Sequence, residues 1–280
     1  MHLVMIVLSL AIAWLLRIEP IESQRTWGER WHQALFYFLF PPLLFLTTAI
    51  SVIAMGFRGE MLGMKASWLS YLISVAFILN AIFLLLKLAY QGYQSIRKVH
   101  TYKSQVVIDR TARILETDFP YSAQIGFWHS QLVVSKGLLK SLDREHLKAV
   151  LTHEQAHVYY HDTFWFFWLG WLRHLTPWLP NTEALWQELL LLRELRADRK
   201  AAEQIDPLIL AESLLKVARD TVQETAILSA NFSCTVPKTR LEERIDFLLE
   251  EQTLVSPASW QNWSWTILSF APLITIPLHG

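Results

Sequence analysis

The chain has 280 residues, of which 52% are hydrophobic and 18% are charged. This apolar content exceeds that of a typical soluble domain and indicates contact with a membrane. The formal net charge is zero, so no basic surface favours nucleic acid as a partner. Because Cys234 is the single cysteine, the chain cannot form an internal disulfide or a CxxC motif.

Residues 1–90 contain three apolar runs, which we interpret as three transmembrane helices. The first run, residues 3–16, could also be a signal peptide, but no basic segment precedes it and no A-x-A-like site follows it. Residues 34–55 and 66–86 contain no charged side chain. Each of these two runs is long enough to cross about 30 Å of hydrocarbon as a helix, which disfavours the alternative of buried helices in a soluble core.

Basic residues follow the third run at Lys87, Arg97, Lys98 and Lys103. Lysine and arginine are enriched in the loops on the cytoplasmic side of a membrane. We therefore expect the chain after the third run to lie in the cytoplasm.

Residues 91–257 have the composition of a soluble domain that contains both strands and helices. Alternation in residues 104–110 predicts a strand, and residues 124–139 predict a turn, a strand at 132–134 and then a loop. Asp143 is typical of the N-cap of an amphipathic helix. Further helices are predicted over residues 182–202, 207–220 and 240–250.

Within this domain, residues 163–180 are nearly as apolar as a membrane span but contain one arginine and one histidine. Two full crossings would need about 40 residues, so the segment is too short for a membrane hairpin. We predict an amphipathic helix at the bilayer surface, with Trp165, Trp168 and Trp171 on one side. The alternative is that these tryptophans pack the core of the domain.

The C-terminal segment, residues 258–280, is again apolar. Trp260, Trp263 and Trp265 precede a run at 265–278 that two prolines interrupt. Tryptophans in this position suit a membrane interface. We predict a short span or a re-entrant segment.

The stretch VLTHEQAHVYYHD, residues 150–162, contains two histidines four residues apart. On a helix, His153 and His157 project from one face and can present two imidazole nitrogens to one ion about 2.0–2.1 Å away. Glu154 lies beside the first histidine, where it can take a proton from a metal-bound water. A chance occurrence of HExxH is the alternative, and a third ligand is needed to exclude it.

The predicted helix 182–202 carries RELRADRKA, residues 193–201, which offers two carboxylates. Glu194 can complete the metal site. Asp198, one turn later, can accept the free N–H of a ligating histidine and fix its tautomer, and Asp162 could do the same or close the end of its helix. The alternative is a solvated helix face among several arginines.

HEQAHVYYHD, followed about 40 residues later by ELRAD, resembles the membrane-embedded gluzincin metallopeptidases. Upstream, GFWHSQLVVSKGLLKSLDREHLKAVL resembles the strand, loop and helix that precede HExxH in the BlaR/MecR antirepressor family. The stretch TRLEERIDFLL is similar to the segment that closes the protease domain there and in the related HtpX and Ste24 peptidases. The resemblance covers roughly residues 121–249.

The resemblance implies an α+β gluzincin (zincin) metalloprotease domain over residues 91–257, set on a multi-helix transmembrane anchor. It implies one Zn(2+) per chain, bound by His153, His157 and Glu194, with Glu154 as the general base. The chain departs from the beta-lactam sensors because no penicillin-binding domain follows, so beta-lactam sensing is not carried over.

The resemblance also implies roles around the site. Asp198 would support a ligating histidine. In such peptidases the strand before the HExxH helix pairs with extended substrate. The predicted substrate edge is Gln131, Leu132, Val133, Val134 and Ser135. The candidates for a donor that stabilises the transition state are His174, Arg240 and Arg244.

These observations favour a membrane-bound zinc endopeptidase of the bacterial cytoplasmic (inner) membrane, a multi-pass protein with its protease domain in the cytoplasm. Its predicted partners are the lipid bilayer and a protein substrate, either a cytoplasmic repressor, a membrane protein or its own chain. Two alternatives stay open: a catalytically idle membrane signalling or scaffold protein, and a protease for membrane-protein quality control. A transporter is disfavoured because the spans carry no charges.

Overall fold

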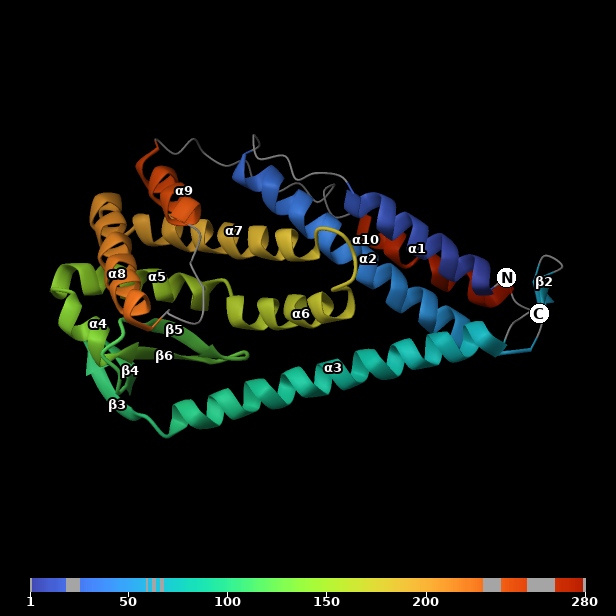
Figure 1. The fold of residues 1–280 in the computed structure, drawn as a ribbon, viewed down its shortest axis with the longest axis horizontal. Coiled ribbons are helices and arrows are strands. Elements are labelled where there is room, and N and C mark those ends of the chain that lie inside the picture. The colour runs from blue at the N-terminus through green and yellow to red at the C-terminus, as the bar shows by residue number, and fades with distance from the viewer. Residues whose placement is uncertain are drawn as a thin grey trace. The chain divides into compact units, whose positions relative to one another are not determined.

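The computed structural model describes residues 2–18, 26–58, 60–61, 64–65, 68–228, 238–250 and 265–278. The fold is mostly helical with a small mixed sheet (Figure 1). Its residues group into two compact units, which are described separately. Unit 1 comprises residues 1–89, 168–192 and 254–280, and unit 2 comprises residues 90–167 and 193–253.

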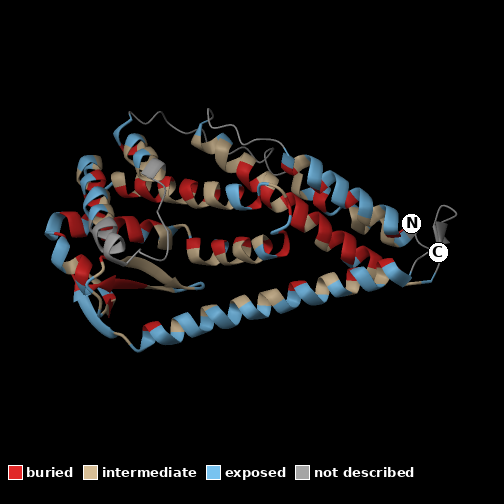
Figure 2. Ribbon diagram, viewed as in Figure 1, coloured by how far each residue is buried: buried red, intermediate tan, exposed pale blue. Residues whose placement is uncertain are grey.

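The three apolar runs of unit 1 are helical, as predicted. They form α1 (His2–Ile18), α2 (Trp27–Met55) and α3 (Trp68–His100), and α3 continues into unit 2. Of the described helices, α2 and α3 are long enough and apolar enough to cross a membrane. Their most apolar windows are 67% and 17% buried, respectively (Figure 2), so α3 presents apolar side chains that no described part of the protein covers.

Shorter elements complete unit 1. A two-stranded hairpin, β1 (Glu60–Met61) and β2 (Met64–Lys65), lies between α2 and α3. The predicted apolar segment at the C-terminus forms α10 (Trp265–Ser269) and a 3-10 helix, η2 (Ala271–Leu278). Thr47 of α2 donates to the carbonyl of Ser269 at 2.6 Å, so this segment packs on α2.

Residues 168–192 belong to unit 1, although the sequence analysis placed them in the protease domain. They come from α6 (Asp162–Leu175), α7 (Thr182–Ala202) and the turn between them. Leu179 packs with Ala13 and Phe45, and Arg30 forms an ion pair with Glu188 at 2.7 Å. Apolar packing and buried polar contacts thus attach this segment to α1 and α2.

The helix predicted over residues 163–180 is present as α6, but its tryptophans do not share one free surface. Trp165 is 58% exposed. The indole of Trp171 instead donates to the carbonyl of Ala81 in α3 at 2.9 Å, and its ring lies 5.9 Å from that of Trp168. The three tryptophans therefore differ in their surroundings, because the second half of α6 packs against an apolar helix, and the location at the bilayer surface stays a prediction.

Unit 2 contains a four-stranded sheet in the order β3-β4-β6-β5. Its strands are β3 (Lys103–Val107), β4 (Arg110–Leu115), β5 (Ser122–Gly126) and β6 (Ser130–Ser135). The single strand predicted at 104–110 is divided by a tight turn in which Ile108 has a φ of 57°, so β3 and β4 form an antiparallel hairpin. β4 and β6 are parallel.

The sheet order shows that the predicted substrate edge is not an edge strand. Residues 131–135 belong to β6, which lies between β4 and β5. Residues 133–135 pair with β4, and residues 130–134 pair with β5. Among the described strands, β5 pairs with β6 alone, so its outer side is a free edge.

The helices of unit 2 follow local signals in the sequence. They are α4 (Lys136–Ser141), α5 (Arg144–Tyr159), α8 (Pro207–Leu228), α9 (Lys238–Leu249) and the second part of α7. Asp143 caps α5 as predicted, because its side chain accepts from the backbone N–H groups of Glu145 and His146. A helix, α4, replaces the loop predicted after β6, and Ser135 is its N-cap.

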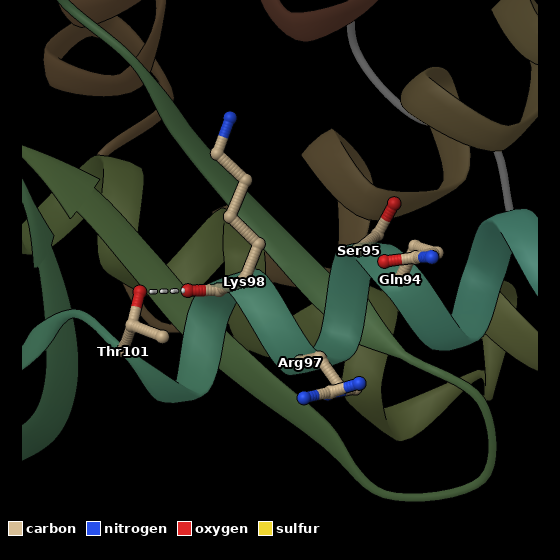
Figure 3. Close-up of a pocket in the computed structure, with 5 residues that line it drawn as sticks. All are labelled: Gln94, Ser95, Arg97, Lys98 and Thr101. Atoms are coloured by element: carbon tan, nitrogen blue, oxygen red, sulfur yellow. Dashed lines mark hydrogen bonds between the residues drawn. The ribbon is translucent and has the colours of Figure 1, made fainter.

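The end of α3 that lies in unit 2 is polar. Thr101 donates to the carbonyl of Lys98 at 2.7 Å. A shallow depression there is lined by Gln94, Ser95, Arg97, Lys98 and Thr101 (Figure 3). It includes none of the predicted site residues.

Candidate metal centre

The two histidines of HEQAH lie on one helix, α5, and the predicted third ligand lies on another, α7. In α5, the Nε2 atoms of His153 and His157 lie 3.1 Å apart. Glu194 of α7 places one carboxylate oxygen 3.2 Å from His153 Nε2 and the other 3.8 Å from His157 Nε2. One ligand atom from each of the three lies within 4.8 Å of the others, so this cluster could hold a metal ion.

The separation of the histidine nitrogens is compatible with a zinc site. Ligands at 2.0–2.1 Å in a tetrahedral site lie about 3.3 Å from one another. The two Nε2 atoms lie 3.1 Å apart, and His153 Nε2 lies 3.2 Å from the nearer oxygen of Glu194. A tetrahedral ion bound by these three side chains would keep its fourth position for water, as in catalytic zinc sites.

A buried carboxylate lies next to the Nδ1 atom of each histidine. His153 Nδ1 lies 2.7 Å from Asp198 Oδ1, and His157 Nδ1 lies 2.7 Å from Asp162 Oδ2. Both aspartates are buried. A proton held on Nδ1 leaves the Nε2 lone pair free for a metal, so the two predicted supporting residues lie where that role requires.

Each aspartate is in turn held by an arginine that the sequence analysis did not place there. Arg244 of α9 makes two parallel hydrogen bonds to Asp198, at 2.7 and 2.8 Å. Arg196 of α7 donates to Asp162, and its guanidinium lies 4.1 Å from the Tyr160 ring centroid. Each of the two buried carboxylates therefore has a cationic partner.

The electrostatics of the cluster favour a cation among its ligands. Burial lowers the pKa of His153, but the carboxylates of Asp198 and Glu194 raise it more, to about 10. Burial raises the pKa of Glu194, but His153, Arg244 and Arg193 hold it well below its ordinary value. The carboxylates are therefore ionised, and the field that favours an imidazolium also favours a divalent ion.

The predicted general base, Glu154, directly follows His153 in α5. Glu154 is 6% exposed, and its Oε1 accepts a hydrogen bond from Ser122 Oγ at 2.7 Å. Ser122 is the first residue of the free-edge strand β5. Sequence reasoning missed this contact because 32 residues separate the two side chains.

The remaining predicted residues differ in their surroundings. His174 is exposed and belongs to unit 1, whereas the cluster lies in unit 2. Arg244 is engaged with Asp198 and comes within 3.6 Å of Glu194. Arg240 lies in α9 and is half-buried. Ser135 accepts from the N–H groups of Leu138 and Tyr121. Cys234 lies outside the described residues.

Comparison with known proteins supports this interpretation at the level of the family. Searches of curated proteins and of solved structures give no significant match. Residues 121–188 match the family model "Peptidase family M48", a stretch that includes β5, β6 and all of α5. The match does not separate the BlaR/MecR type from the HtpX and Ste24 types. With the His/His/Glu cluster and a helical fold that contains a small mixed sheet, it supports the M48 metallopeptidase family for this chain.

Proposed function

We propose that this protein is a zinc-dependent endopeptidase of the bacterial cytoplasmic membrane. The observation that carries the proposal is the cluster of His153, His157 and Glu194. Glu154 follows His153 in the same helix, is buried and accepts a hydrogen bond from Ser122. A purely structural metal site has no use for a buried carboxylate that is hydrogen-bonded beside the ligands. The arrangement therefore favours hydrolysis over the alternative of an idle scaffold.

The residues divide the chemistry of peptide hydrolysis between them. Bound zinc would supply Lewis-acid polarisation and lower the pKa of a water ligand. Glu154 would take a proton from that water at a carboxylate oxygen and later deliver it to the leaving amine. The Ser122 hydroxyl keeps the carboxylate in place, and Asp198 and Asp162 hold the histidines in the tautomer that binds metal.

Substrate would bind along the free edge of β5 rather than along β6. A polypeptide in extended form can add to such an edge through backbone hydrogen bonds. The edge begins at Ser122, which contacts Glu154. An added strand would therefore bring a peptide bond close to the general base.

The apolar helices support a membrane location for this activity. The α2 and α3 helices have the length and hydropathy of spans, and the exposed apolar side chains of α3 would be covered by lipid. Substrates would be membrane proteins, a repressor delivered to the membrane or the chain itself. A protease for membrane-protein quality control would use the same chemistry. It would differ from a regulatory protease only in the proteins that it cleaves.

Removal of metal provides a direct test of the peptidase proposal. Purified full-length protein in detergent should cleave an unstructured protein, and a chelator should reduce cleavage to background because the catalytic water would lose its activating ion. Adding zinc back should restore the rate. The readout is fragment formation on a gel, with metal content measured in the same samples. Cleavage that persists in protein shown to be metal-free would contradict the proposal.

The basic residues after the third apolar run predict the side of the membrane on which unit 2 lies. A reporter enzyme that is active only outside the cytoplasm should be silent when it is fused after Lys103, because positively charged flanks remain inside. A fusion after Arg58, one span earlier, serves as the matched control and should be active. The reverse pattern of activities would overturn the orientation.

A further inference from the structure

An aromatic surface lies directly beyond the end of the free-edge strand. Phe127 and Trp128 follow Gly126, the last residue of β5, and they meet the start of α6. The Phe127 ring lies 5.0 Å from that of Phe164, and the Trp128 ring lies 4.9 Å from it. Trp165 adjoins Phe164 at 5.1 Å. We call these four residues the aromatic patch.

The patch is held in one arrangement by its own contacts. Trp128 stacks on His161 with a centroid distance of 4.8 Å and an interplanar angle of 14°. Thr163 donates to the carbonyl of Phe127 at 2.8 Å. These contacts fix the β5–β6 turn against the corner between α5 and α6. A surface organised in advance loses little conformational freedom when it binds a partner.

The patch nevertheless remains open. Trp128 is 53% exposed, Trp165 58% and Phe127 38%. Packing of the turn therefore uses only part of each ring. Clustered exposed aromatic side chains in a folded protein mark sites of association, and tryptophan is enriched among residues that dominate binding energy.

The geometry of β5 relates the patch to the metal cluster. Ser122 contacts Glu154, and the strand then runs four residues further to Gly126. At about 3.3 Å per residue, this corresponds to roughly 13 Å along the edge. A substrate strand has the same rise, so a substrate residue opposite Gly126, where the patch begins, lies about four residues from the one opposite Ser122. Antiparallel pairs are the more stable kind, and in that direction the patch meets the N-terminal side of the substrate.

We propose that the aromatic patch is an apolar subsite that selects substrates with a large apolar side chain about four residues before the scissile bond. The inference rests on the proposed peptidase function and narrows its substrate class. The enzyme would prefer segments with an apolar residue at that distance, a feature of the ends of membrane-spanning segments.

Three peptides of equal length test the subsite with full-length protein in detergent. The first carries Phe four residues before the cleavage site, the second carries Phe four residues after it, and the third carries Ser at both positions. The first peptide should have a kcat/KM about tenfold above that of the third, the lower end of the range for apolar pockets. Trp128→Ser should remove this preference and leave the Ser peptide unaffected, and Trp128→Phe should keep most of it.

The outcomes separate this inference from the proposed function. Equal loss of kcat/KM for all three peptides in Trp128→Ser would mean that Trp128 only holds the turn, and would overturn the subsite. Equal kcat/KM values for the three peptides in the wild type would also overturn the subsite. If, in that case, Trp128→Ser impaired only the cleavage of a membrane-embedded substrate in vesicles, the patch would be a lipid contact. Cleavage that persists in Glu154→Gln would instead refute the peptidase mechanism, whatever the preference.

Discussion

Replacing Glu154 with Gln is expected to reduce peptide cleavage by a factor of roughly 10²–10⁴, the usual contribution of a general acid–base group, while the protein keeps its zinc. The amide has the shape of the carboxylate, and its oxygen can still accept the hydrogen bond from Ser122. It cannot take a proton from water. The three metal ligands are unchanged, so binding of the ion should persist.

Initial rates of cleavage and metal content, measured on the same purified samples, check this expectation. Glu145→Gln is the matched control: it makes the same chemical change at an exposed position in the same helix, and it should behave as wild type. If Glu154→Gln cleaves at the wild-type rate, Glu154 is not the general base. If it loses zinc together with activity, the result would instead show that Glu154 is needed to hold the ion.

Replacing either His153 or His157 with Ala is expected to abolish stoichiometric zinc binding and, with it, cleavage. Each substitution removes one of three protein ligands and leaves an ion that two side chains cannot retain. Asp198→Asn should have a smaller effect, a fall in zinc affinity of about 10–100-fold, because Asp198 contacts His153 and Arg244 and is not itself a ligand. The loss of zinc affinity is expected to be larger for a residue that binds the ion than for a residue that contacts a ligand.

Competition with a zinc-sensitive dye measures the affinities, and circular dichroism shows whether each variant is folded. His100→Ala, an exposed position in α3, provides the histidine control and should bind zinc as the wild type does. Wild-type affinity in folded His157→Ala would exclude His157 as a ligand. An Asp198→Asn effect as large as that of His153→Ala would show that the aspartate is more than an orienting group.

Much of the candidate site could be predicted from the sequence because its geometry is local. The spacing of His153 and His157 becomes a fixed distance once α5 forms, and Asp143 begins that helix in the expected way. The helix predicted over residues 182–202 is confirmed by α7 at both ends. The spacing of apolar residues and the presence of a capping residue are properties of short stretches of chain. They can therefore be recognised in the sequence without tertiary structure.

Contacts between distant segments could not be predicted in this way. The pairing of Ser122 with Glu154 and the bond from Arg196 to Asp162 join separate elements. The order of the sheet is also non-local: β6 lies between β4 and β5, and alternation along one strand does not reveal which neighbours it has. The sequence therefore predicts a strand at residues 132–134 but does not reveal that this strand lies inside the sheet.

By itself, the sequence determined the apolar helices, the zinc-type motif and the residues able to complete it, because hydropathy and helical spacing are properties of short segments. Only the tertiary structure decided which side chains hold the histidines, which strand edge is free and where residues 168–192 pack. Trp171 illustrates the difference: its indole donates to the carbonyl of Ala81, 90 positions earlier in the chain. Such a contact depends on how helices pack side by side, and no local pattern of residues encodes that.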